Sequence, residues 1–263
     1  MRKIILLGVF LLLWGNALSL AQDKEEYYRV GYVYFSQGNY EKALEAYRKA
    51  LEIDPQYLDA RYWLGKTLEQ MGRISEAVKE WRTILSIAPR HRDAFQKWRA
   101  YAPSFVRDGE VIEQYKEVFL REDVPSFSRE EGWSSLAPLG FVLLEQNDFL
   151  SSYLASRIFG WAREHLSLLF APYEEEALRK ALEGVISGEP RLVYRFLREF
   201  TVRFGEDPVW REPLQKAFEQ IFSSTLGGAQ GAQGVEFTLL GGKVEKRILY
   251  GSTLEETSFF LNE

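Results

Sequence analysis

The chain has 263 residues and no cysteine, which excludes disulfide bonds, thiolate metal sites and a lipid-modified cysteine. It has two histidines, His91 and His165, and neither lies near a second histidine or a carboxylate cluster at metal-ligand spacing. We expect both to be solvated or helix-capping residues rather than ligands or general bases. Because no covalent or metal cross-link is expected, packing must stabilise the fold, and hydrophobic residues make up 46% of the chain.

Motifs of enzyme chemistry are also missing. There is no nucleophile elbow or zinc-type pair, and the glycine-rich run at 227–234 lacks the lysine and preceding strand of a phosphate-binding loop. The acidic run Glu174–Glu176 follows Pro172 and is predicted to be the solvated first turn of a helix, where negative charge is favourable. The sequence therefore predicts no enzyme, catalytic residue, cofactor or metal.

Positive charge is in deficit. The chain carries 33 Lys and Arg residues against 38 Asp and Glu residues, a formal net charge of −5. Binding to a phosphate backbone needs a basic stripe. We therefore expect no nucleic acid among the partners.

An uncharged run covers residues 4–21 and follows two basic residues, with its most apolar part at 4–14. This layout is typical of a secretory signal peptide, and the small Ala21 suits cleavage before Gln22. A retained membrane anchor is the alternative, since about 20 apolar residues span a bilayer. Either way, we expect an extracytoplasmic location, periplasmic or secreted. If the segment is retained, it anchors the chain in the inner membrane, and we expect no other membrane contact.

Residues 27–89 contain one 34-residue pattern written twice. The identical pairs are Gly31/Gly65, Gly38/Gly72, Ala43/Ala77, Arg48/Arg82, Leu51/Leu85, Ile53/Ile87 and Pro55/Pro89. Each copy predicts two helices joined at a glycine, with Asn39 capping the second helix in the first copy and a proline after each pair. One helical hairpin cannot bury its apolar face alone, so neighbouring pairs must stack.

The two copies resemble tetratricopeptide repeats, with Tyr47 and Trp81 at the aromatic place of the pattern. The resemblance implies repeats at about 24–57 and 58–91, followed by a capping helix at 93–101. It also implies an α-solenoid of antiparallel helix pairs whose shared function is to hold a protein partner in the groove lined by the first helices.

Residues 103–226 are predicted to form further helical hairpins, as a degenerate continuation of the repeats. In the best register Gly140 takes the place of the small glycine and Asn147 that of the turn glycine. Ser156 then falls at the aromatic place, which breaks the pattern. The fold class is therefore all-α, an α-solenoid with two clear repeats and less regular hairpins after them.

The tail has a different composition. Residues 227–234 predict a flexible glycine-rich linker, and two strands around Gly241 and Gly242 predict a short β-hairpin-like end. The expected organisation is a signal peptide or anchor at 1–21, a repeat domain at 22–102, a helical domain at 103–226 and a tail at 227–263.

The implied groove is lined by one side of each first helix. Its residues are Tyr28, Tyr32, Phe35, Tyr62, Trp63, Lys66, Gln96 and Lys97. Some family members grip a terminal carboxylate with lysine and asparagine, but Tyr28 and Tyr32 occupy those places in the first repeat. An aromatic groove for apolar or proline-containing segments is the sharper hypothesis. The alternative is that the second half of the chain covers these rings as core.

Three functions from different classes follow. The leading one is an extracytoplasmic adaptor or scaffold that binds a protein or peptide in the concave groove. Other envelope proteins are the expected partners. The second is a structural subunit of an envelope assembly, held through the C-terminal half or tail. The third is an enzyme accessory domain or a degenerate enzyme.

The native protein is expected to begin at Gln22, because a signal peptide would be removed after Ala21. Mass spectrometry of the amino-terminal peptide measures this. Retention of residues 1–21 in the native chain would favour the anchor instead.

Overall fold

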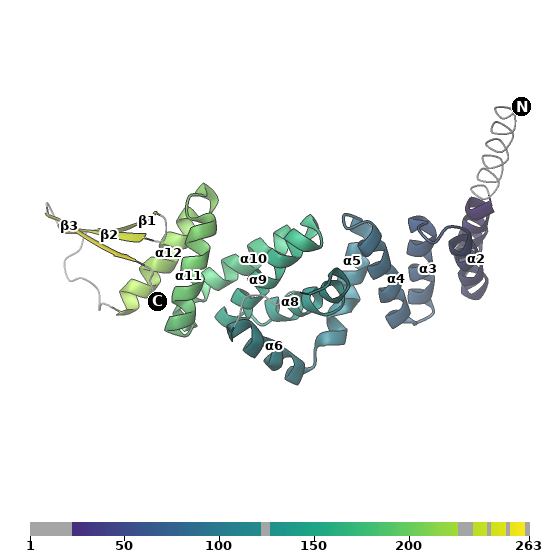
Figure 1. Ribbon diagram of the computed structural model, residues 1–263, viewed down its shortest axis with the longest axis horizontal. Helices are drawn as coiled ribbons and strands as arrows, with labels where there is room; N and C mark the ends of the chain where they lie inside the picture. Colours follow the sequence, from purple (N-terminus) through teal and green to yellow (C-terminus); the bar gives the residue numbers. More distant parts are fainter. Residues whose placement is uncertain (1–22, 122–126, 226–233, 241–242, 251–252, 261–263) are drawn as a thin grey trace, which may run out of the picture. The chain divides into compact units, whose positions relative to one another are not determined.

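The computed structural model describes residues 23–121, 127–225, 234–240, 243–250 and 253–260 (Figure 1). The chain divides into two units. The first unit contains residues up to Arg107 together with Phe127–Pro138 and Leu166–Leu169. The second contains Asp108–Ser126, Leu139–His165 and Phe170–Glu263. The predicted signal peptide or anchor at 1–21 and residues 227–233 of the predicted linker lie outside the described residues.

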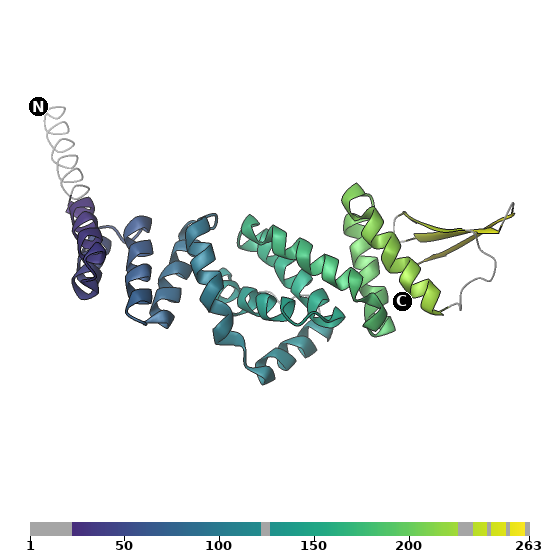
Figure 2. The ribbon, with the colours of Figure 1, turned by 180° about the vertical axis from the view of Figure 1, so that it is seen from behind.

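The first unit is a series of antiparallel helices that follow one another in chain order (Figure 2). Residues 23–36 form its first described helix. The others are α2 (Tyr40–Ile53), α3 (Leu58–Gln70), α4 (Ile74–Ile87), α5 (Arg92–Tyr101), the 3-10 turn η1 (Ala102–Val106), α7 (Arg129–Glu131) and the π-helical turn η2 (Gly132–Leu136). Each predicted repeat therefore contains one helix pair.

The turns inside both repeats use glycine in the left-handed region. Gly38 has φ 74° and Gly72 has φ 75°, a backbone conformation that glycine adopts without a steric penalty. The Asn39 side chain then accepts a hydrogen bond from the Lys42 amide at 3.4 Å, which confirms Asn39 as the cap of α2.

The two helices of each repeat approach so closely that a side chain at the small glycine would clash. A Cβ built on Gly31 would lie 2.7 Å from Cε1 of Tyr47, and one on Gly65 would lie 2.5 Å from Nε1 of Trp81. Both aromatic side chains are fully buried. The glycine and the aromatic ring therefore act as a matched pair, in which the ring lies directly against the opposing backbone.

The predicted capping helix, α5, packs on α4 and is itself covered. The buried Trp98 of α5 meets the buried Trp133 of η2 edge-on, with 5.0 Å between ring centroids. Arg82 of α4 also donates hydrogen bonds to Ser134 and, at 3.3 Å, to Glu130. The helix stack of the first unit thus continues with residues 127–138, which pack on α4 and α5. The 34-residue repeat did not predict this packing.

The remaining helices belong mainly to the second unit. They are α6 (Gly109–Arg121), α8 (Ala137–Leu144), α9 (Phe149–His165), the 3-10 turns η3 (Leu168–Phe170) and η4 (Val185–Ser187), α10 (Ala171–Glu183), α11 (Pro190–Phe204) and α12 (Pro208–Thr225). Their core is rich in aromatic rings. Phe196 of α11 contacts Tyr153 of α9 at 5.2 Å, and Phe200 contacts Trp210 of α12 at 5.2 Å. The described helices therefore form an all-α repeat array.

The hairpin of α8 and α9 keeps the repeat geometry with an altered spacing. Asn147 takes the left-handed turn with φ 53°, where the first two repeats use glycine. A Cβ on Gly140 would lie 2.9 Å from Cε1 of Phe159. Phe159, three residues beyond Ser156 and hence about one helical turn further, takes the place of Tyr47 and Trp81. Ser156 is buried but supplies no ring.

Glu174 corrects the expectation for the acidic run. The residue is 5% exposed, and its carboxylate accepts hydrogen bonds from Arg163 Nε of α9 at 2.6 Å and from an Arg203 terminal nitrogen of α11 at 2.8 Å. Gly160 leaves room for it, because a Cβ there would lie 2.8 Å from Glu174 Oε1. The prediction of a solvated turn is wrong for Glu174, while Glu175 and Glu176 are exposed as expected.

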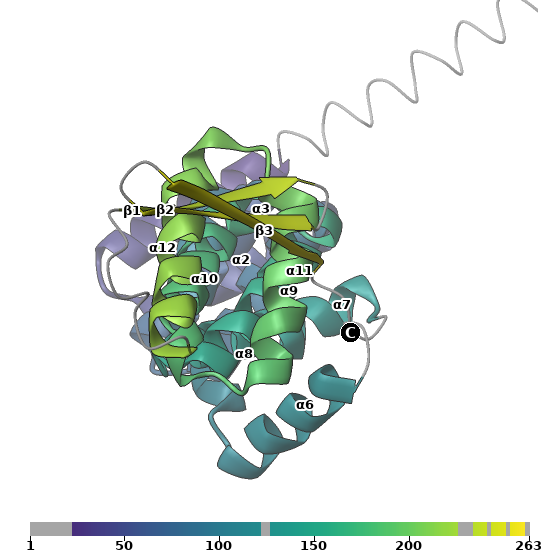
Figure 3. The ribbon, with the colours of Figure 1, turned by 90° about the vertical axis from the view of Figure 1, so that its left-hand side faces the viewer.

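Three strands follow the helices and lie side by side as a sheet (Figure 3). They are β1 (Gly234–Leu240), β2 (Lys243–Tyr250) and β3 (Thr253–Phe260), antiparallel in the order β1-β2-β3. Val235 pairs with Ile248, and Val244 pairs with Phe259. The third strand, β3, was not predicted from the sequence. In the described part of the chain, no helix combines the length and the hydropathy that crossing a bilayer requires.

Gly65→Ala is expected to lower the free energy of unfolding by about 1–2 kcal/mol, because overpacking against Trp81 outweighs the better helix propensity of alanine. Urea denaturation measures this. Gly109→Ala is the control, since nothing lies within 4 Å of a Cβ there. Equal stability changes in the two variants would contradict the close-packing argument.

Glu174→Gln is expected to lower the free energy of unfolding by about 2–3 kcal/mol, since it leaves two arginines without their shared carboxylate. This loss is smaller than for a fully buried ion pair, because the Arg163 and Arg203 side chains are 30% and 42% exposed to solvent. Glu175→Gln, which removes an exposed pair with Arg179, should change stability by less than about 1 kcal/mol. Thermal unfolding of both variants tests the difference, and a Glu174→Gln variant as stable as Glu175→Gln would refute it.

Candidate functional site

The first helices of the two repeats bring aromatic residues together in the first unit. The helix over 23–36 supplies Tyr32 and Phe35, and α3 supplies Tyr62, Trp63 and Lys66. Residues three or four apart share one face of a helix, so each helix presents its members on the same side. We call these five residues the aromatic surface.

Trp63 is the centre of the aromatic surface. Its ring meets Tyr32 edge-on at 4.8 Å between centroids, Phe35 at 5.1 Å and Tyr62 at 6.4 Å. Lys66 Nζ lies 4.1 Å from the Trp63 ring centroid, and 5.7 Å and 6.0 Å from those of Phe35 and Tyr62. The contacts hold the rings in a fixed cluster with one cation on it.

The aromatic surface is accessible, unlike the aromatic residues of the repeat core. Tyr32 is 46% exposed, and the other four members are half-buried, whereas Tyr47 and Trp81 are fully buried. Large, rigid and partly exposed rings are the side chains that dominate protein interfaces. Their assignment to partner binding stays a prediction.

Tyr28 lies beside this cluster and is half-buried. Its ring contacts Tyr57 at 5.5 Å and Tyr47 at 6.1 Å. Burial raises the pKa of Tyr28, and the Asp59 carboxylate raises it further, while a hydrogen bond with the Trp63 side chain acts in the opposite direction. The phenol therefore stays neutral at pH 7.

Lys97 and Gln96 lie on α5, and neither belongs to the ring cluster. Lys97 Nζ donates to both carboxylate oxygens of Glu69, at 2.9 and 2.8 Å, and the Tyr101 hydroxyl donates to the same carboxylate. That hydrogen bond raises the pKa of Tyr101. The charge of Lys97 is thus neutralised within the unit, while Gln96 is exposed.

Glu69 and Tyr101 were not among the residues predicted for the groove. A signal for Glu69 was available, because Tyr62, Lys66 and Glu69 are spaced as i, i+4 and i+7 and therefore share a face of α3. The ion pair itself depends on how α5 lies against α3, which the spacing does not give.

The two histidines have structural roles. His91 Nδ1 accepts a hydrogen bond from the Ala94 amide at 3.2 Å, which confirms it as the cap of α5. Its ring also stacks on Tyr62 at 5.8 Å. His165 is exposed and stacks on Trp161 at 4.9 Å. Within the described ranges, no three His, Cys, Asp or Glu residues gather as a metal site would need.

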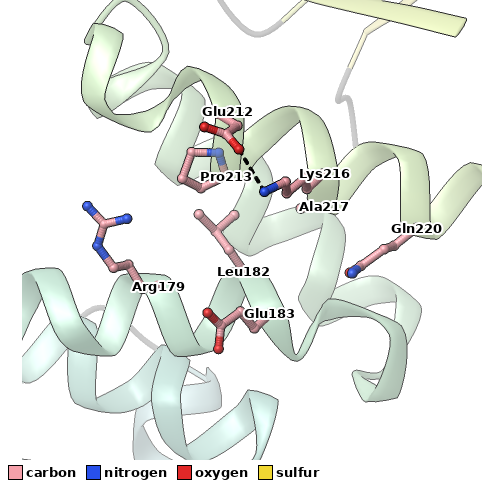
Figure 4. A pocket seen from close by; sticks show the side chains of 8 residues that line it. All are labelled: Arg179, Leu182, Glu183, Glu212, Pro213, Lys216, Ala217 and Gln220. Atoms are coloured by element: carbon pink, nitrogen blue, oxygen red, sulfur yellow. Dashed lines mark hydrogen bonds and ion pairs between the residues drawn. The ribbon is translucent and has the colours of Figure 1, made fainter.

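A cavity of about 280 Å³ lies in the second unit between α10 and α12. Figure 4 shows its lining, in which Leu182 points from α10 toward Pro213 of α12. The lining residues are Arg179, Leu182, Glu183, Glu212, Pro213, Lys216, Ala217 and Gln220. Glu212 and Lys216 pair at 2.7 Å, and Arg179 pairs with Glu175 at 2.9 Å. The lining thus combines apolar side chains with charged ones, and the charges of Arg179, Glu212 and Lys216 are paired.

Two family comparisons agree with this geometry. Residues 31–72 match the family described as TPR repeat, and residues 58–91 match the family described as tetratricopeptide repeat. Residues 31–91 therefore match tetratricopeptide repeats, as the resemblance in the sequence implied. Proteins of this repeat family typically mediate protein–protein interactions and are usually not enzymes.

Two curated proteins are similar to the chain. A TPR repeat-containing protein of Methanocaldococcus jannaschii is 25% identical over 150 residues, which is 53% of this chain and 26% of that protein. A photosystem I assembly protein of Acaryochloris marina is 28% identical over 103 residues, 32% of this chain and 62% of that protein. The chain thus spans less than two thirds of either relative.

Several solved structures are similar at low identity. A thermophilic TPR protein of Thermus thermophilus is 18% identical, with a TM-score of 0.30 over 74% of this chain and 99% of that one. PilF of Pseudomonas aeruginosa is also 18% identical, with a TM-score of 0.30 over 81% of this chain and 96% of that one.

Proposed function

We propose that the chain is an adaptor or scaffold outside the cytoplasm that holds an apolar or proline-containing segment of a protein partner on the aromatic surface. The observation that carries the proposal is the cluster around Trp63, with Tyr32 46% exposed beside it. Repeats of this family bind protein partners, which supplies the class of ligand.

The packing of the repeats supports this choice of surface. Gly31 and Gly65 allow the two helices of each pair to approach closely. Tyr47 and Trp81 then fill the core between them. The rings of the aromatic surface are then not needed to fill the interior of a repeat. Rigid rings lose little conformational entropy on binding, and they fit proline rings and aliphatic side chains.

The neighbouring charged residues limit where the partner binds. Lys97 forms an ion pair with Glu69, and the Tyr101 hydroxyl donates a hydrogen bond to the same carboxylate. A partner that used Lys97 would have to compete with this ion pair. We therefore centre the binding site on the first two repeats, and treat Gln96 and Lys97 as its border.

The location outside the cytoplasm rests on the uncharged run at 4–21. Envelope proteins are the partners that this location would make available. The two other functions, a structural subunit of an envelope assembly and an accessory domain or degenerate enzyme, stay predictions from the sequence.

Trp63→Ala and Tyr32→Ala are expected to abolish capture of the partner from an envelope fraction. Truncation of a central aromatic residue at an interface typically costs about 2 kcal/mol or more, roughly a 30-fold loss of affinity. Affinity capture with the full chain, followed by quantitative mass spectrometry, measures the loss. Circular dichroism and urea unfolding should show an intact fold.

Phe105→Ala is the matched control, because Phe105 is an exposed ring of η1 outside the aromatic surface. It should leave capture unchanged. Capture by the Trp63 and Tyr32 variants at the level of the Phe105 variant would refute the proposed site.

A further inference from the structure

Two lysines of the predicted groove, Lys66 on α3 and Lys97 on α5, have different surroundings. Lys97 donates to both oxygens of Glu69. Lys66 lies over the Trp63, Phe35 and Tyr62 rings, and among the described residues no carboxylate lies within ion-pair distance of it. The first unit therefore neutralises one of the two cations and leaves the other on the aromatic surface.

The rings attract the Lys66 ammonium but accept no conventional hydrogen bonds from it. A ring face attracts a cation through its quadrupole, yet it offers no lone pairs for the three N–H donors of the ammonium. The Lys66 side chain is half-buried, so it is partly withdrawn from water. Interactions with an opposite charge are stronger in such a place than in bulk water.

We propose that the aromatic surface recognises an internal peptide segment in which an apolar side chain is closely followed or preceded by Asp or Glu. The apolar group covers Trp63 and Tyr32, and the carboxylate accepts hydrogen bonds from Lys66 Nζ. This inference rests on the proposed function and specifies the chemistry of its ligand. It concerns a side-chain carboxylate, since Tyr28 and Tyr32 stand where a grip on the chain terminus would need lysine and asparagine.

The distance between Lys66 and Trp63 limits how far apart the apolar and acidic residues of the peptide can be. Lys66 Nζ lies only 4.1 Å from the centroid of the Trp63 ring, so the apolar and acidic groups must be neighbours. An extended chain advances about 3.3–3.6 Å per residue. The acidic residue is therefore one or two positions from the apolar residue that contacts Trp63.

A random library of 12-residue peptides displayed on phage, selected on the full chain, tests the proposal. The selected sequences are expected to be enriched in Asp or Glu within two positions of an apolar residue or proline. The strongest peptide and its Asp→Asn or Glu→Gln counterpart are then synthesised, and fluorescence anisotropy measures their Kd for each protein variant.

Lys66→Met keeps an unbranched apolar side chain on the rings but removes the charge, and is expected to raise Kd about tenfold. The neutral peptide should bind wild type about as weakly, and the two changes together should add little. Lys66→Arg should restore most of the affinity. Raising the salt concentration should weaken binding of the acidic peptide to wild type and hardly affect the Lys66→Met variant.

Lys42→Met is the matched control. Lys42 also lies over a ring, 5.5 Å from that of Tyr34, but it is exposed and lies on α2 outside the aromatic surface. Its loss should leave Kd unchanged.

Selected peptides without acidic enrichment, or equal binding by wild type and Lys66→Met, would overturn the inference. If Trp63→Ala abolished binding in that case, the aromatic surface would still be the binding site. Failure of wild type to select any peptide, or selection unaffected by Trp63→Ala, would overturn the inference together with the proposed function.

Discussion

The close approach of a glycine to an aromatic ring is the contact on which the helical array depends. Gly31 faces Tyr47, Gly65 faces Trp81 and Gly140 faces Phe159, each at a distance that leaves no room for a Cβ. The ring fills the groove between two helices and removes a large apolar area from water. Because each pair is too small to be stable alone, this contact and the stacking of pairs stabilise the repeats together.

The same contact decides which rings remain at the surface. Since Tyr47 and Trp81 fill the interior of their repeats, Tyr32, Phe35 and Trp63 are free to cluster with one another. They stabilise one another, yet they keep part of their surface in contact with water. A cluster that is ordered before binding loses less entropy when a partner docks, which favours its use as an interface.

Much of the fold could be predicted from the sequence because its causes are local. The left-handed turn at Gly38, the cap at Asn39 and the cap at His91 depend on residues within four positions of one another. The residues of the aromatic surface could be proposed because the resemblance to tetratricopeptide repeats implied which side of the first helices lines a groove. By contrast, Phe159 replaces Ser156 as the packing ring, since a shift of about one helical turn restores the same face of α9.

The sequence by itself determined the repeat period, the helix pairs and their turns, because each follows from backbone sterics and the 3.6-residue helical period. Only the tertiary structure decided that Glu174 is buried between Arg163 and Arg203, that Lys97 is neutralised by Glu69, and that Trp133 covers Trp98. These contacts join residues from separate helices, between 11 and 35 positions apart. Their formation depends on how helices pack, which no local pattern records.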